Sequence, residues 1–126
     1  MKNGLRAIGC VAACLGLMLA GCGGSSEPEP ASGDAEAGRK LYLDNGCAAC
    51  HGYRGAGDGP LARSLPTKPR DLRISGSYQN GSNVASIAET VKTGLMDKGT
   101  GMPPYPHLPE RDRLRIAAFL VSLRSQ

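Results

Sequence analysis

The sequence is poor in aromatic residues. Its 126 residues include four Tyr, one Phe and no Trp, so aromatic side chains make up 4% of the chain. A chain of this length holds one small domain, and with so few aromatic side chains it lacks material for a large core of its own. The length excludes a two-domain enzyme.

Concentrated positive charge and strand patterns are also missing. The 15 Lys and Arg outnumber the 11 Asp and Glu, but the basic residues form no run that is typical of nucleic-acid binding. No segment alternates apolar and polar residues over the length of a strand. We therefore expect no nucleic-acid partner and an all-α domain of three or four helices held together by long loops.

The first 21 residues have the pattern of an export signal. Lys2 and Arg6 precede an uncharged run over residues 7–20. This run is too short for a transmembrane helix. The run ends in Leu-Ala-Gly before Cys22, and this sequence resembles the cleavage motif of bacterial lipoproteins. The resemblance implies cleavage of residues 1–21 and lipidation of Cys22. The alternative is an uncleaved apolar helix with a chance Cys at its end.

Residues 22–33 are predicted to be a lipidated Cys followed by a flexible tether. The segment is small, polar and Pro-containing, so it can bury little apolar area. It would hold the domain, residues 34–126, close to the periplasmic side of a bacterial membrane. Gly23 stands where an Asp would resemble an inner-membrane retention signal, so the outer membrane is favoured over the inner.

Position divides the five cysteines of the chain. Cys10 and Cys14 lie in the predicted signal, and Cys22 is predicted to carry lipid. Two thiols remain, Cys47 and Cys50, and we expect no disulfide.

Three segments have helical patterning. Residues 34–45 are predicted to begin with Asp34 as N-cap, residues 83–93 end before a Gly, and residues 109–124 carry an apolar stripe. The 52–81 segment is rich in Gly and Pro. A long irregular segment in a compact domain favours a functional role, such as wrapping a bound ligand.

The informative motif is Cys-Ala-Ala-Cys-His at residues 47–51, which has the Cys-x-x-Cys-His pattern of covalent c-type haem attachment. On one helical turn, positions i, i+3 and i+4 share a face. The thiols of Cys47 and Cys50 can therefore form thioethers with the haem vinyl groups while the imidazole of His51 reaches the iron. A porphyrin would also supply the core that the few aromatic residues do not.

Cys-x-x-Cys pairs also occur in redox sites and in zinc sites. A thioredoxin-type redox pair requires strands in a βαβ unit, which the sequence does not predict. A zinc site could combine Cys47, Cys50, His51 and His107, but adjacent Cys and His ligands are not the usual zinc-finger spacing.

The sixth iron ligand has three candidates, Met96, Met102 and His107. Met102 is favoured because the two prolines after it keep the backbone extended and prevent a helix from carrying its side chain away. Met96 is expected to pack, and His107 to lie on the surface. A His/Met pair fills both axial positions and suits electron transfer, whereas an open sixth position would permit peroxide or gas chemistry.

Taken in order, these elements resemble a class I monohaem cytochrome c, and the resemblance covers residues 34–126. It implies a cytochrome c fold around one covalently bound haem, with Gly38 and Tyr42 on the first helix facing Ile116 and Phe119 on the last. It also implies that the carbonyl of Pro60 accepts the Nδ1 proton of His51.

The resemblance further implies a one-electron carrier of a respiratory chain rather than an enzyme. Its partners would be redox proteins, such as a membrane oxidase or reductase. The alternatives are a haem c subunit of a larger oxidoreductase and an open-site haem enzyme or gas sensor. Without Trp, the candidates for binding the haem propionates are Tyr78, Arg70 and Arg73.

Overall fold

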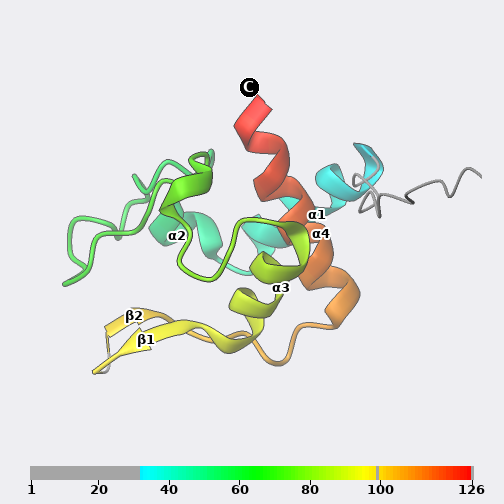
Figure 1. Cartoon of the computed structure of the whole chain (residues 1–126). Helices are drawn as coiled ribbons and strands as arrows, with labels where there is room; N and C mark the ends of the chain where they lie inside the picture. Colours follow the sequence, from blue (N-terminus) through cyan, green and yellow to red (C-terminus); the bar gives the residue numbers. More distant parts are fainter. Residues whose placement is uncertain (1–31, 99, 126) are drawn as a thin grey trace, which may run out of the picture.

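The computed structural model describes residues 32–98 and 100–125 (Figure 1). The predicted signal segment and Cys22 lie outside the described residues. The helices are α1 (Ser32–Asp44), α2 (Cys47–His51), α3 (Val84–Thr93) and α4 (Glu110–Ser122), with 3-10 turns at Ser75–Ser77 and Leu123–Ser125. Two short strands, β1 (Leu95–Asp97) and β2 (Thr100–Met102), form an antiparallel hairpin. The mostly helical architecture expected of a cytochrome c fold is confirmed.

The first helix begins earlier than its sequence suggests. α1 begins at Ser32, so Asp34 lies in its first turn and is not the N-cap. An acidic side chain in a first turn is stabilised by the positive end of the helix dipole. Asp34 also accepts from Nε of Arg115 on α4 at 3.3 Å, so it links the first helix to the last.

α1 and α4 cross at a glycine. A Cβ atom on Gly38 would lie 1.8 Å from the carbonyl oxygen of Arg115 and 3.0 Å from Cβ of Phe119. One turn further along α1, the ring of Tyr42 meets the ring of Phe119 edge to face, with centroids 5.3 Å apart. Ile116 is 1% exposed beside them. The helix contact implied by the resemblance is confirmed, and the missing Cβ is what lets the backbones approach (Figure 1).

The hydrophobic core is built around α4. The expectation of an apolar inward face on α4 holds for Ile116, Phe119 and Leu120, which are buried, but Leu114 is 36% exposed. Burial of one large apolar side chain stabilises a fold by about 1.5–3 kcal/mol, so this face is a major source of stability. The core cluster consists of Tyr42, Ala48, Ile87, Ala88, Val91, Leu108, Ile116, Ala117, Phe119, Leu120 and Leu123.

The hairpin is not visible as a pattern in the sequence. β1 and β2 are three residues long each, with Leu95 opposite Met102 and Met96 opposite Gly101. Three residues are too few to show an alternation of apolar and polar side chains, which is why no strand was expected. The prediction that Met96 packs is wrong, since its side chain is 51% exposed on β1.

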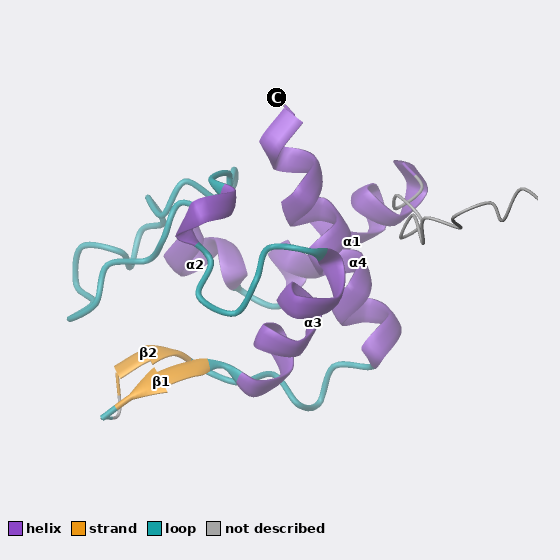
Figure 2. Cartoon of the chain, in the orientation of Figure 1, coloured by secondary structure: helices purple, strands orange, loops and turns teal. Residues whose placement is uncertain are grey.

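The helices and the irregular segments lie on different sides of the domain. Figure 2 shows α1, α3 and α4 gathered on one side, while the long loop that follows α2 and the hairpin lie on the other. α2 lies between these two sides. Among the described residues, no helix has the length and apolar character needed to cross a bilayer.

Candidate haem-binding site

α2 is a five-residue helix that carries both thiols of the motif. It is preceded by Gly46, whose φ of 73° allows the sharp turn from α1 into α2. Cys47 and Cys50 are free and half-buried, and Cys47 packs against the core cluster. Burial, and to a lesser extent the nearby Cys50, raise the pKa of Cys47 to about 11. A redox-active Cys-x-x-Cys pair needs a lowered thiol pKa, so this environment argues against the thioredoxin-type alternative.

His51 ends α2 with its imidazole largely withdrawn from water. Burial lowers the pKa of His51, and the backbone of Arg70 has a smaller opposite effect. The neutral ring that burial favours is the form that ligates a metal. Its Nδ1 atom is buried and, among the described residues, completes no hydrogen bond of normal geometry.

Four of the five carbonyl groups of α2, those of residues 48–51, accept hydrogen bonds from backbone amides of residues 52–61. A helix as short as α2 leaves nearly all of its carbonyls without partners inside the helix. We call the segment of residues 52–61 the clamp loop. Its bonds run from Gly52 N to Ala48 O (2.9 Å), Leu61 N to Ala49 O (2.9 Å), Gly59 N to Cys50 O (3.1 Å) and Gly57 N to His51 O (2.9 Å).

The glycines of the clamp loop are required by this close approach. A Cβ atom on Gly59 would lie 2.4 Å from the carbonyl oxygen of Ala49. On Gly57 it would lie 2.5 Å from the carbonyl oxygen of Pro69. The glycine content of this segment, which the sequence suggested to be the mark of a bound ligand, is thus explained in part by backbone packing against α2 and against residues 69–70.

Tyr42 connects α1 to the end of α2. Its hydroxyl donates to the carbonyl of Gly52 at 2.7 Å, and the residue is 1% exposed. Burial, with a smaller contribution from Cys47, raises the pKa of Tyr42 well above its usual value, so the hydroxyl keeps its proton as a donor. The same side chain therefore packs the helix crossing and fixes the turn after His51.

Met102 lies at the end of β2, half-buried and in contact with the core cluster. Three residues later, the amide of Tyr105 donates to the carbonyl of Val91 at 2.9 Å and holds this segment on α3. Burial, with smaller contributions from Cys47 and Cys50, raises the pKa of Tyr105. Cys47, Met102 and Tyr105 all pack against the same core cluster, although half the domain separates α2 from the Met102 segment in sequence.

Pro60 is exposed on the clamp loop, between Gly59 and Leu61. The predicted hydrogen bond from His51 Nδ1 to its carbonyl is not formed. The backbone group that acts on the imidazole belongs to Arg70 instead. Counting residues from the motif could not find it, because the approach of residues 69–70 depends on how the clamp loop folds back.

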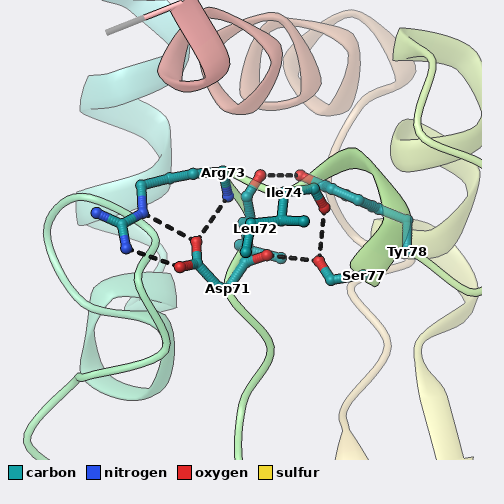
Figure 3. Close-up of polar contacts among 6 residues, drawn as sticks. All are labelled: Asp71, Leu72, Arg73, Ile74, Ser77 and Tyr78. Carbon is teal, nitrogen blue, oxygen red and sulfur yellow. Dashed lines mark hydrogen bonds and ion pairs between the residues drawn. The ribbon is translucent and has the colours of Figure 1, made fainter.

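The three candidates for propionate binding lie within residues 70–78, and Figure 3 shows two of them, Arg73 and Tyr78. Arg73 donates from Nε and Nη2 to the carboxylate of Asp71, at 2.9 and 2.7 Å. Arg70 donates to the carbonyl of Ser77 at 2.7 Å, and the hydroxyl of Tyr78 donates to the carbonyl of Leu72 at 2.7 Å. These bonds hold the 70–78 turn together, and no propionate role is assigned to any of the three.

The zinc alternative is not supported. His107 is exposed, and its nearest ring contact is with Tyr105 at 5.9 Å between centroids. In the described part of the chain, no group of three or more His, Cys, Asp or Glu side chains is arranged to hold a metal ion. The donor set on α2, two thiols and an imidazole whose Nδ1 is buried, fits covalent haem attachment.

Two helices that cross at a glycine, a Cys-x-x-Cys-His turn whose first Cys packs against the core, and a Met-Pro-Pro segment define a haem-binding electron-transfer domain. The family model for cytochrome c matches residues 35–124. The chain therefore belongs to the cytochrome c family, and it binds haem c covalently through Cys47 and Cys50.

Two larger proteins contain segments that are similar to this chain. The chain is 35% identical over 94 residues to lupanine 17-hydroxylase [cytochrome c] of a Pseudomonas species, covering 75% of this chain and 12% of that protein. It is 26% identical over 96 residues to cytochrome c oxidase subunit 2 of Alkalihalophilus pseudofirmus, covering 76% of this chain and 28% of that protein. The match thus spans about an eighth of the length of the first relative and about a quarter of the length of the second.

A solved structure with the same fold is a chain of the Kuenenia stuttgartiensis reducing HAO-like protein complex. The TM-score is 0.66 at 31% sequence identity, and the match covers 75% of this chain and 45% of that one. Like the two relatives, this neighbour is longer than the present chain.

Proposed function

We propose that this protein is a one-electron carrier of a respiratory chain, held by lipid on Cys22 at the periplasmic side of a bacterial membrane, with His51 and Met102 as the axial iron ligands. The observation that carries the proposal is that Met102 and Cys47 pack against the same core cluster, because a second iron-ligand candidate then lies in the same part of the fold as the turn that carries His51. A bound haem would supply one-electron redox chemistry. With His51 and Met102 both held to the iron, no site for a substrate would remain on it.

The position of Met102 supports its role over its competitors. A Cβ atom on Gly94, where α3 ends, would lie 2.7 Å from the carbonyl oxygen of Met102, so the helix end holds the backbone of this residue. Met96 is exposed on the hairpin and His107 is exposed before α4. Met102, by contrast, is half-buried and packs against the core cluster.

Replacing Met102 with Ala tests the ligand set, with Met96→Ala as the matched control. We expect M102A to lose the Met-to-iron charge-transfer band of the ferric protein, to bind carbon monoxide when ferrous, and to have a lower reduction potential, because a soft thioether favours the reduced state. M96A should keep the band and the potential. A band that persists in M102A, or carbon monoxide binding by the unaltered ferrous protein, would contradict the proposal.

A second candidate is a haem subunit of a larger oxidoreductase. The relatives favour it, since in both of them the matching segment is a small part of a protein named for an oxidation reaction. Gentle solubilisation of membranes that contain the native protein distinguishes the two. Recovery with a stoichiometric larger protein would identify a subunit, and recovery alone would identify a carrier that meets its partners freely.

The lipid anchor is tested by replacing Cys22 with Ala. We expect C22A to leave the membrane fraction with an unchanged haem spectrum and to exchange electrons with membrane-bound partners more slowly, because the tether raises the effective concentration. Separation of inner and outer membranes of cells with the unaltered protein tests the expected outer-membrane location. Equal rates for the anchored and the released protein would contradict a functional anchor.

A further inference from the structure

Gly94 is the junction between α3 and the hairpin that carries Met102. Its N–H donates to the carbonyl of Thr90 at 2.8 Å and closes the last turn of α3. The next residue begins β1. The φ of Gly94 is +72°, a conformation that favours glycine at a helix end because other residues rarely adopt it.

The chain returns to this junction after the hairpin. A Cβ atom on Gly94 would lie 2.7 Å from the carbonyl oxygen of Met102. It would also lie 2.7 Å from the nitrogen of Pro104 and 2.9 Å from the carbonyl carbon of Pro103. All three atoms belong to the backbone, so they cannot rotate away as the end of a flexible side chain could. The missing side chain of Gly94 therefore sets how closely residues 102–104 approach the end of α3.

Residues 102–104 are held on both sides of this contact. Met102 pairs with Leu95 in the hairpin. The amide of Tyr105 donates to the carbonyl of Val91 on α3 at 2.9 Å. Because the segment cannot slide along α3, a side chain at position 94 would push the backbone of Met102 away from the helix end.

We propose that Gly94 is a positioning residue for the axial methionine: its bare Cα seats the Met102 backbone on the end of α3 and so holds the thioether in place as an iron ligand. This inference rests on the proposed ligation of iron by Met102. An external ligand binds only to the fraction of iron that Met102 has released, so its apparent affinity reports how firmly the thioether is held. Displacing the backbone of Met102 increases that fraction.

The test compares Gly94→Ala with Gly81→Ala, which lies just before α3, in the haem-loaded protein. Gly81 also has a positive φ, +96°, but a Cβ atom there would meet only the side chain of Ser86. Both variants therefore carry backbone strain, and only G94A pushes on residues 102–104. We expect the apparent affinity of the ferric protein for imidazole to rise about tenfold in G94A, with a weaker Met-to-iron charge-transfer band, whereas G81A should keep both. Equal imidazole affinities in the two variants would overturn the inference.

A second measurement needs no variant. In the unaltered ferrous protein, NMR should show nuclear Overhauser contacts between the Hα protons of Gly94 and the Hδ protons of Pro104, because the Cβ position of Gly94 lies against the nitrogen of Pro104. Absence of these contacts would overturn the inference, since the Met102 segment would then not rest on the helix end. If M102A leaves the charge-transfer band and the imidazole affinity unchanged, the proposed ligand set fails. If M102A changes both while G94A matches G81A, only the role of Gly94 fails.

Discussion

At the scale of single residues, the glycines differ in what surrounds their missing side chains. Gly38 is pressed against the carbonyl of Arg115, whereas Gly76 has nothing within 4 Å. The resemblance to class I cytochromes c identified the first as the point where two helices cross. It gave no comparable reason for the second.

Replacing Gly38 with Ala should destabilise the protein by about 1–3 kcal/mol, because a carbonyl 1.8 Å from the new atom forces the helices apart. This loss outweighs the roughly 1 kcal/mol that Ala gains over Gly in a helix. Denaturant unfolding of the haem-loaded protein measures the change. Gly76→Ala is the control and should leave the unfolding midpoint nearly unchanged. Equal stability of the two variants would show that α1 and α4 do not cross at Gly38.

The ion pair of Asp71 with Arg73 should make the stability of the fold depend on pH. Hydrogen bonds from Arg73 lower the pKa of Asp71 to about 2 from its usual 3.8. The folded state thus binds this proton less readily than the unfolded state, so the contribution to stability is complete above about pH 4 and is lost as the pH falls to about 2.

Asp71→Asn should therefore flatten the fall in stability between about pH 4 and pH 2 and lower the stability slightly at neutral pH. The urea midpoint at each pH measures this, with Asp97→Asn as control because that side chain makes no ion pair in the described residues. Parallel curves for D71N and the unaltered protein would contradict the ion pair with Arg73.

At the scale of secondary structure, α2 depends on its surroundings. A helix of five residues does not form alone in water, since nucleation is unfavourable and few internal hydrogen bonds repay it. The clamp loop provides the missing donors to its carbonyls, and Tyr42 holds the turn that follows. The haem-attachment motif is therefore presented by tertiary contacts and not by helix propensity.

Hydrogen exchange tests the clamp loop. The amides of Gly57, Gly59 and Leu61 should exchange about 100-fold more slowly than those of Tyr53 and Arg54, which donate no backbone hydrogen bond in the described part of the chain. NMR of the ferrous protein resolves single amides. Uniform fast exchange over residues 53–61 would show that the loop does not close on α2.

At the scale of the whole molecule, unpaired positive charge lies on the segment that follows α2. Arg54, Arg63 and Lys68 form no ion pair among the described residues, and Arg63 and Lys68 line an open depression there with Asp58. The depression includes none of the thiols or axial-ligand candidates. Because the Leu61 amide bonds to Ala49 between the two cysteines, this charge lies beside the haem-attachment turn.

Reversal of Arg63 and Lys68 to Glu should slow oxidation by hexacyanoferrate and speed oxidation by a cationic cobalt complex, each roughly two- to fivefold at low ionic strength. Stopped-flow kinetics measures both rates, and the differences should shrink at high salt. Arg39→Glu with Lys92→Glu changes the net charge equally on other elements and should have a smaller effect. The same effect from both pairs would show that only net charge matters.

The motif determined much of the chemistry from sequence alone. Covalent attachment through Cys47 and Cys50 needs only residues at i, i+3 and i+4 of one turn, and this spacing is written in the chain. The helix contact at Gly38 was predicted from the resemblance to class I cytochromes c, and its physical reason is that only a glycine permits so close a crossing. The axial role of Met102 and the lipid on Cys22 stay predictions.

Only the tertiary structure decided which groups surround His51. The backbone of Arg70, and not that of Pro60, acts on the imidazole, and the clamp loop and Tyr42 fix the turn that carries it. The hairpin that carries Met102 was also invisible in a sequence of short, glycine-containing strands. The physical reason is common to these cases. Helical spacing is local and repeats within one turn, whereas the approach of two backbone segments depends on how a long irregular loop folds back, and no pattern of side chains encodes that distance.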